Sequence, residues 1–201
     1  MRIFALEYAT GGGILERPTL AHCRAEGEAM LRTLVTDLAD IPEVEIEIAV
    51  DAATSAAWPP RVRCHSIVSA DRVDPTWDEI LSTSDTIWPI APETGGLLAA
   101  LTERAEQRQR KVLGSPSGAV RLTGSKLATA QHLAKYGIPV VPTYPYEASI
   151  EPPASASGWV VKPDDGTGGD GTQHLATAGE LRRRLDGGRD ATAVIQPFVP
   201  G

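Results

Sequence analysis

The sequence predicts an α/β protein in which an open parallel sheet is followed by a smaller part of α+β type. Over residues 1–114, short apolar segments alternate with helical patterns, which is typical of a parallel sheet flanked by helices. From residue 115 onward, a helical segment precedes strand patterns that surround a glycine-rich loop. We therefore divide the chain into two domains, residues 1–114 and residues 115–201.

The first domain contains five segments with strand patterns, joined by helical ones. The expected strands are residues 3–8, 44–50, 67–69, 86–90 and 111–113. Apolar residues recur at helical spacing between Leu20 and Leu38, and a second helix is expected over residues 96–109. Open sheets of this kind bind ligands beyond the carboxyl ends of their strands. This rule indicates Glu7, Tyr8 and the loop of residues 10–13, and the turn of residues 89–96 that contains Glu93.

The composition argues against several classes of function. The chain of 201 residues is 42% hydrophobic and carries a formal net charge of −7, which argues against nucleic acid as a partner. No stretch approaches the ~20 apolar residues that a membrane-spanning helix needs. Charge arrives too early at the N-terminus for a signal peptide, and Cys23 and Cys64 lack the spacing of metal ligands. We expect a cytoplasmic protein that contacts neither membrane nor nucleic acid.

The most informative segment is a strand pattern from Trp159 to Lys162 that leads into a glycine-rich loop. The loop consists of Gly166, Thr167, Gly168, Gly169, Asp170 and Gly171. Glycines adopt positive φ at little steric cost and let backbone N–H groups approach a ligand closely. Successive N–H groups in such a turn form an anion site, and Lys162 adds a positive charge beside it. The segment therefore predicts binding of a nucleotide polyphosphate.

Three common nucleotide-binding patterns do not fit this loop. A dinucleotide fingerprint requires a helix directly after the glycines. Here a short strand is expected over residues 172–175, and the next helix begins at Thr177, which has capping-box spacing to Glu180. A P-loop requires Gly-Lys-Ser/Thr, which is absent. A protein kinase has its lysine downstream of the loop, whereas no lysine follows Lys162. What remains is a strand–loop–strand flap whose lysine precedes the glycines.

Two further segments of the second domain accompany the flap. Ser125 is a good N-cap, which places Lys126 in the first turn of a helix that Gly137 ends. A cation in that turn opposes the helix dipole at a cost of about 0.3–1 kcal/mol, which an ordinary surface lysine also tolerates. Residues 193–201 form an apolar strand followed by a hinge. Each segment alone is a weak indication of nucleotide binding. The three segments together, in this order along the chain, are a strong one.

Together the three segments resemble the ATP-grasp superfamily of carboxylate–amine ligases. The resemblance implies a Rossmann-like pre-ATP-grasp sheet followed by the first half of an ATP-grasp α+β fold. It also implies that Lys126 and Lys162 act as catalytic lysines that neutralise the α- and β-phosphates of ATP, and that the loop of residues 166–171 covers the β- and γ-phosphates. The residues expected to contact adenine are Gln196, Pro197, Phe198 and Val199. The family more often has a glutamate near the position of Gln196.

The resemblance further implies ATP and Mg²⁺ as cofactors. ATP-grasp enzymes take their Mg²⁺ ligands from acids and an asparagine near the C-terminal end of the fold, and Mg²⁺ uses about one or two carboxylates besides phosphate oxygens. We expect these ligands beyond residue 201 and assign none within the chain. The chain is therefore interpreted as a fragment or a natural half that binds nucleotide without turning it over alone.

Within the superfamily, residues 6–13 and 88–97 resemble the tyramine–glutamate ligases of methanofuran-type cofactor biosynthesis. The implied reaction joins a carboxylate (glutamate) to an amine through an acyl phosphate, with Glu93 and Glu7 holding the substrate. The implied partners are a small-molecule carboxylate and amine, with homodimerisation as an option. A pterin glutamate ligase is a neighbouring alternative, and nothing in the sequence favours the bicarbonate substrate of the biotin carboxylases.

A different class of function stays open at this point. A regulatory or non-catalytic nucleotide-binding module, or one subunit of a split ligase, would keep the flap and lack the metal site. Glu93 would then be only an acid near a helix N-terminus, where the dipole favours it. The glycines of residues 11–13 would likewise form only a tight turn between a strand and a helix.

Overall fold

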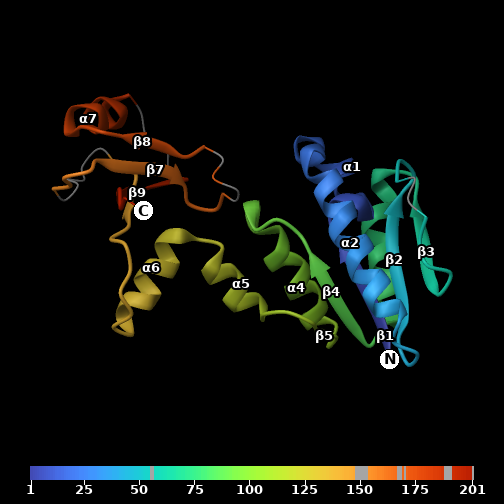
Figure 1. Ribbon diagram of the computed structural model, residues 1–201. Coiled ribbons are helices and arrows are strands. Elements are labelled where there is room, and N and C mark those ends of the chain that lie inside the picture. The colour runs from blue at the N-terminus through green and yellow to red at the C-terminus, as the bar shows by residue number, and fades with distance from the viewer. Residues whose placement is uncertain (55–56, 148–153, 167–168, 170, 188–191, 201) are drawn as a thin grey trace. The chain divides into compact units, whose positions relative to one another are not determined.

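The computed structural model describes residues 1–54, 57–147, 154–166, 169, 171–187 and 192–200. Its contacts form two compact units (Figure 1). The first unit contains Met1–Pro92 and Leu97–Ser117, and the second contains Glu93–Gly96 and Gly118–Gly201. Each unit is described separately below. Within the described part of the chain, no helix combines the length and apolar character needed to cross a bilayer.

The first unit is a five-stranded parallel sheet with the strand order β3-β2-β1-β4-β5. Its strands are β1 (Arg2–Glu7), β2 (Glu45–Asp51), β3 (Val62–Ile67), β4 (Thr86–Ile90) and β5 (Lys111–Val112). Its α-helices are α1 (Ile14–Glu16), α2 (Arg24–Ala39), α3 (Val73–Thr83) and α4 (Leu97–Gln107). Shorter helical turns are η1 (Ala9–Gly13), η2 (Pro18–Cys23) and η3 (Ala70–Arg72). This architecture confirms the predicted α/β class.

The third strand lies elsewhere than predicted. The sequence pattern indicated residues 67–69, whereas β3 covers Val62–Ile67 and pairs with β2 from Ile46↔Val62 to Asp51↔Ile67. Only the two ends of β3 are buried, because it is an edge strand whose middle positions face solvent. Its polar interior, Arg-Cys-His-Ser, therefore shows no apolar run, and the segment could not be recognised from hydrophobic pattern alone.

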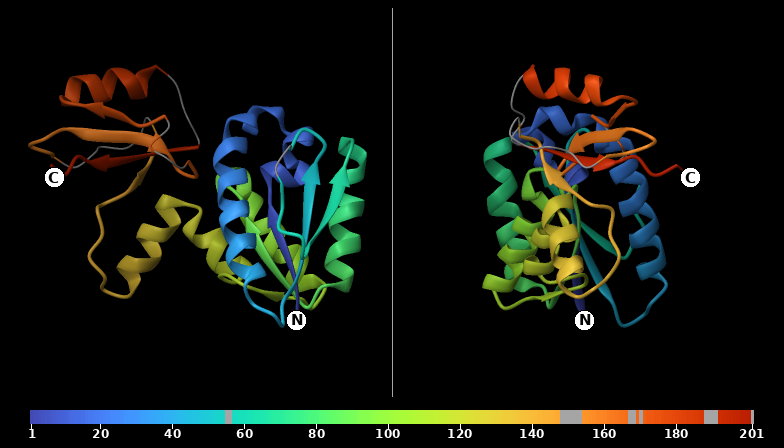
Figure 2. Two further views of the ribbon diagram at one scale, coloured as in Figure 1. Left: turned by 45° about the vertical axis from the view of Figure 1, so that its right-hand side comes forward. Right: turned by 90° about the vertical axis from the view of Figure 1, so that its left-hand side faces the viewer.

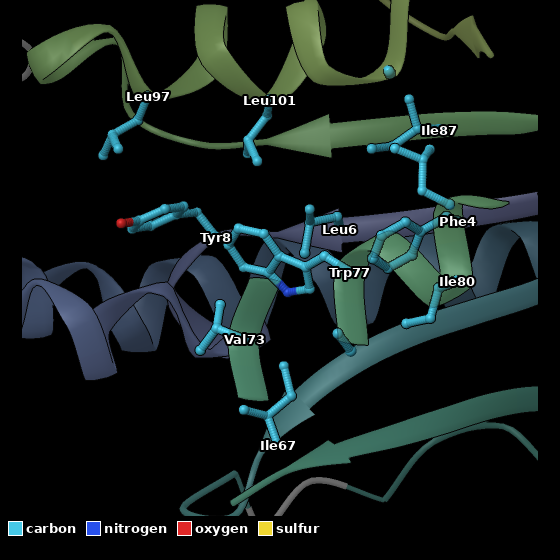
Figure 3. Close-up of a cluster of buried hydrophobic side chains, with 13 residues drawn as sticks. Phe4, Leu6, Tyr8, Ile67, Val73, Trp77, Ile80, Ile87, Leu97 and Leu101 are labelled. Atoms are coloured by element: carbon cyan, nitrogen blue, oxygen red, sulfur yellow. The ribbon is translucent and has the colours of Figure 1, made fainter. Parts of the chain in front are cut away.

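Side chains of β1 alternate between the two faces of the sheet and build a hydrophobic core on each. Phe4 and Leu6 pack with residues of α3 and α4, as Figure 3 shows around Trp77. On the other face, Ile3 and Ala5 pack against α2. Figure 2 shows α2 and α3 on opposite sides of the sheet. The central strand is therefore buried on both faces, which fixes the position of its carboxyl end.

The turn after β1 is organised by Glu7, which is 2% exposed. Its carboxylate accepts hydrogen bonds from the backbone N–H groups of Ala9 (3.0 Å) and Thr10 (2.7 Å) and from the Thr10 hydroxyl (2.8 Å). Gly27 of α2 lies directly against this carboxylate, because a Cβ at position 27 would be 2.4 Å from the Glu7 carboxyl carbon. The glycine thus lets the helix close over a buried, fully engaged acid.

The second unit contains a four-stranded antiparallel sheet with the order β6-β9-β7-β8. Its strands are β6 (Tyr144–Pro145), β7 (Trp159–Pro163), β8 (Gln173–Leu175) and β9 (Ala193–Pro197). Its helices are η4 (Thr94–Gly96), α5 (Ser117–Thr123), α6 (Lys126–Lys135) and α7 (Ala178–Asp186). The short strand predicted after the glycine loop is present as β8, and Thr177 and Glu180 form the predicted capping box of α7.

Gly27→Ala tests the packing of α2 on Glu7. The added methyl group would collide with a carboxylate that cannot move without losing its hydrogen bonds, and such overpacking costs about 1–3 kcal/mol. We expect a lower free energy of unfolding in urea by that amount, despite the better helix propensity of alanine. Gly114→Ala is the control, since its nearest neighbour would be 3.8 Å away. Equal stability of both variants would show that Glu7 is not held as described.

Candidate nucleotide-binding site

Lys162 stands near the end of β7, just before the glycine loop. It pairs with Val194 of β9 in the antiparallel ladder and is half-buried. Burial, and secondarily the positive charge of Lys126, lowers the pKa of its ammonium group below the ordinary lysine value. Within the described residues, the Lys162 ammonium makes no hydrogen bond or ion pair. The described part of the site therefore holds two nearby cations, of which only Lys126 has hydrogen-bond partners there.

Lys126 is the first residue of α6, as predicted. Ser125 caps this helix by accepting a hydrogen bond from the N–H of Ala128 (3.0 Å), which leaves Lys126 in the first turn. The Lys126 ammonium donates to the carbonyl oxygens of Asp164 (3.1 Å) and Gly166 (2.7 Å). The lysine is thereby anchored to the beginning of the glycine loop.

Asp164 joins the loop to α6 in a second way. Its carboxylate accepts a hydrogen bond from the backbone N–H of Leu127 (2.8 Å), one of the unsatisfied donors of the helix N-terminus. Its carbonyl oxygen also accepts from the backbone N–H of Lys126 (3.1 Å). The sequence analysis missed this role. Asp164 follows Lys162 by two residues, but its partner Leu127 lies far away along the chain, so no local pattern indicates the bond.

Two of the three described glycines of the loop, Gly169 and Gly171, have the positive φ for which glycine was predicted. Gly169 has φ +77° and Gly171 has φ +68°. A Cβ at position 171 would lie 2.9 Å from Cγ of Pro163, so a side chain there would also be crowded. The expected phosphate contacts of Thr167, Gly168 and Asp170 lie outside the described residues. Those of Gly166, Gly169 and Gly171 stay predictions.

The residues predicted to contact adenine lie at the end of β9. Gln196 donates from Nε2 to the hydroxyl of Thr143 (2.8 Å), and Pro197 pairs with Trp159. The N–H of Phe198 donates to the carbonyl of Gly158 (2.9 Å). Phe198 and Val199 are 37% and 64% exposed, and the Phe198 ring lies 4.4 Å from that of His174.

This geometry narrows how the adenine contact could be made. Because the N–H of Phe198 is already engaged, a base bound here would have to use the remaining backbone groups of the hinge. The amide of Gln196 would likewise have to exchange its bond to Thr143 for one to the base. The adenine contact therefore stays a prediction.

The two candidate substrate acids lie in different units. Glu93 is half-buried, and the turn that it begins belongs to the second unit. In that turn, the N–H of Gly95 donates to the Asp165 carboxylate (2.9 Å). This bond places the Glu93 turn beside the start of the glycine loop. Glu7 belongs to the first unit, where its oxygens are engaged as described above. The substrate roles of both acids stay predictions.

A magnesium site was not predicted within the chain. Among the described residues, no three His, Cys, Asp or Glu side chains are grouped closely enough to hold a metal ion. Asp164 and Asp165 are engaged with Leu127 and Gly95 respectively. The expected use of Mg²⁺ stays a prediction.

Lys126→Met should raise the pKa of Lys162, because one of the two causes of its depression is removed. NMR titration of the lysine side chains measures this directly, with Lys135→Met at the exposed end of α6 as the control. Since the folded pKa lies below the unfolded value, the unfolded chain binds more protons between the two. The free energy of unfolding should therefore rise with pH across that window. An unchanged Lys162 pKa in Lys126→Met would contradict the proximity of the two ammonium groups.

Asp164→Ala removes the side-chain acceptor at the start of α6. Loss of a helix cap costs about 0.5–2 kcal/mol, so we expect faster hydrogen exchange at the Leu127 amide and a lower free energy of unfolding. Asp164→Asn, which keeps an acceptor oxygen, should retain most of the protection. Identical exchange in the wild type and in Asp164→Ala would show that the carboxylate does not cap the helix.

Comparisons with known proteins agree with this architecture. Residues 44–120 match the family model described as the pre ATP-grasp 3 domain. No curated protein matches the chain. A structure from Archaeoglobus fulgidus assigned to the ATP-grasp superfamily is 19% identical, covers 100% of this chain and 54% of its own, and gives a TM-score of 0.66.

Two solved structures of named enzymes are also similar. The L-amino acid ligase from Bacillus licheniformis is 16% identical over 100% of this chain and 44% of its own, with a TM-score of 0.57. The N5-carboxyaminoimidazole synthetase from Staphylococcus aureus, complexed with ADP, is 12% identical over 98% and 47%, with a TM-score of 0.58. The chain thus spans about half the length of these structures. Its fold is a pre-ATP-grasp parallel sheet followed by the N-terminal half of an ATP-grasp fold.

Proposed function

We propose that this chain is the nucleotide-binding part of an ATP-dependent ligase that joins a carboxylate to an amine through an acyl phosphate. The observation that carries the proposal is the pair of lysines at the start of the glycine loop. Lys126 and Lys162 lie close enough for one charge to lower the pKa of the other. Neither is ion-paired with an acid within the described residues.

These groups fit a polyphosphate. Two half-buried ammonium groups without acidic partners repel each other, and an anion between or beside them would relieve that repulsion. The Lys126 ammonium is held by neutral carbonyl oxygens, which phosphate oxygens can replace with stronger charge-assisted bonds. Gly169 and Gly171 have the positive φ that anion-binding turns use.

The chemistry explains why a carboxylate ligase needs such a site. A carboxylate cannot lose oxide, so bound ATP supplies a phosphoryl group that makes one carboxyl oxygen a good leaving group. As a carboxylate oxygen bonds to the γ-phosphorus, the bond to the β,γ-bridging oxygen breaks and ADP is released. The amine nitrogen then attacks the carbonyl carbon, phosphate departs, and the nitrogen loses a proton. Lys126 and Lys162 would align the phosphates and neutralise their charge.

The substrate class follows from the resemblance and not from the site. The segments around Glu7 and Glu93 support glutamate as the carboxylate and tyramine as the amine, in methanofuran-type cofactor biosynthesis in the cytoplasm. Glu93 would hold the substrate amine beside the glycine loop, and Mg²⁺ would neutralise further phosphate charge. A non-catalytic nucleotide-binding module would share the lysine pair and differ only in the absence of amide formation.

Calorimetric titration with a non-hydrolysable ATP analogue tests the nucleotide site. We expect saturable binding that weakens at higher salt and falls at least about tenfold in Lys126→Met or Lys162→Met, because each loses a charge-assisted bond of roughly 1.5–3 kcal/mol. Lys135→Met should bind like the wild type. Absent binding, or equal binding by all three variants, would refute the assignment.

ADP release with glutamate and tyramine present, compared with either alone, then separates a ligase from a binding module. Release that requires both substrates supports the ligase. Nucleotide binding without release under any pair of carboxylate and amine supports the module.

A further inference from the structure

A cavity lies wholly within the first unit, beyond the carboxyl end of β1. Its volume is about 200 Å³, which is below the ~300–1,000 Å³ of pockets for drug-sized ligands and suits a small metabolite. Trp77, Leu97 and Leu101 form an apolar wall, which Figure 3 shows next to Tyr8. Ligands of open parallel sheets bind at this end of the strands. The cavity is therefore correctly placed for a substrate.

Tyr8 lines this cavity and contributes a hydroxyl group to it. The residue as a whole is only 4% exposed, but its hydroxyl oxygen is not among the buried atoms that lack a partner, so the oxygen is open to solvent. Its ring packs edge-on to Trp77, with centroids 5.9 Å apart, and Figure 3 shows the hydroxyl directed away from that ring. Burial raises the pKa of this phenol, so it is protonated at neutral pH and can donate. The hydroxyl makes no hydrogen bond among the described residues and is therefore available to a ligand in the cavity.

The backbone around Tyr8 is shaped to hold its ring in this position. A Cβ at position 13 would lie 2.5 Å from Cζ of Tyr8, so Gly13 lets the chain pack flat against the ring. The N–H of Gly13 also donates to the carbonyl of Tyr8 (2.8 Å), and the N–H of Tyr8 donates to Ile90 (2.8 Å). Since the ring is held by Gly13 and Trp77, the position of its hydroxyl oxygen is fixed at the cavity.

The rim of the cavity carries one cation and one anion that are not paired within the protein. Arg17 and Glu16 are both exposed, and neither side chain makes a hydrogen bond or an ion pair within the described residues. The other two charged residues of the rim, Asp74 and Arg104, bind each other, and Arg104 also binds Asp78. The charges free to bind a ligand are therefore one guanidinium and one carboxylate.

We propose that this cavity binds a free α-amino acid through its charged head group. Arg17 and the Tyr8 hydroxyl would bind the α-carboxylate, since a guanidinium and a phenol both donate to carboxylate oxygens. Glu16 would bind the α-ammonium. The aliphatic part of the side chain would lie against Leu97 and Leu101. A purely anionic ligand would leave Glu16 repelled, and a simple amine would leave Arg17 and Tyr8 unsatisfied.

The assignment of this amino acid as a ligase substrate rests on the proposed function, whereas its binding does not. Binding is therefore measured by NMR titration of the chain without any nucleotide, using L-leucine and L-glutamate as separate probes. Leucine tests the apolar wall, and glutamate tests the substrate suggested by the resemblance. Each is compared with analogues that lack one charge: isocaproate and isoamylamine for leucine, glutarate and γ-aminobutyrate for glutamate.

We expect at least one of the two amino acids to bind saturably with a Kd of about 1 mM or tighter, the range of typical KM values. Its two analogues should bind at least about tenfold more weakly. Shifts should centre on the amides of Tyr8, Leu97 and Leu101. Absent binding of both amino acids, or an analogue that binds as tightly as its parent, would overturn the proposal, whatever the nucleotide titration shows.

Three variants assign the contacts. Tyr8→Phe keeps the packed ring and removes only the hydroxyl, so it should fold normally and bind the amino acid more weakly. Arg17→Gln should lose at least about tenfold in affinity for the amino acid, with little change for the amine analogue. Arg63→Gln removes the same charge from the exposed side of β3 and serves as the control. Unchanged affinity in both Tyr8→Phe and Arg17→Gln would place the ligand elsewhere.

Discussion

The bond network between the start of the glycine loop and the N-terminus of α6 determines the arrangement of the candidate nucleotide site. Asp164 takes part through both its carbonyl oxygen and its carboxylate, which bind Lys126 and Leu127. A carboxylate at the positive end of a helix offsets the unfavourable position of a lysine in the first turn. The network thus allows two half-buried cations to stay close together, with no described acid paired to either of them.

Such an arrangement is stable without a ligand and still suited to one. In the absence of an anion, carbonyl dipoles satisfy the Lys126 ammonium, and the cost of keeping Lys162 charged is expressed as its depressed pKa. Under the proposed function, phosphate oxygens would replace those dipoles with full charges, and the lysines would need little movement. Preorganised charges of this kind act without a reorganisation cost when negative charge develops.

Local rules predicted much of the fold and part of this site. Capping at Ser125 and Thr177, and the strands on both sides of the glycine loop, follow from residues adjacent in sequence. The β3 error had the opposite cause, because an edge strand with a polar middle lacks an apolar pattern. The roles of Asp164 and Asp165 and the cavity at Tyr8 depend on partners distant in sequence, which no local pattern reveals.

Glu7 and Tyr8 show why burial alone does not identify a functional residue. Both are nearly inaccessible, and they follow each other at the end of β1. The Glu7 carboxylate is already bound by Ala9 and Thr10, so its burial is explained by the turn that it shapes. The Tyr8 hydroxyl has no such partner among the described residues, although its ring is held firmly by Trp77 and Gly13. The rule that ligands bind beyond the carboxyl ends of parallel strands indicates both residues alike. Their hydrogen bonds distinguish them, because the acid is used by the turn and the phenol is available to a ligand.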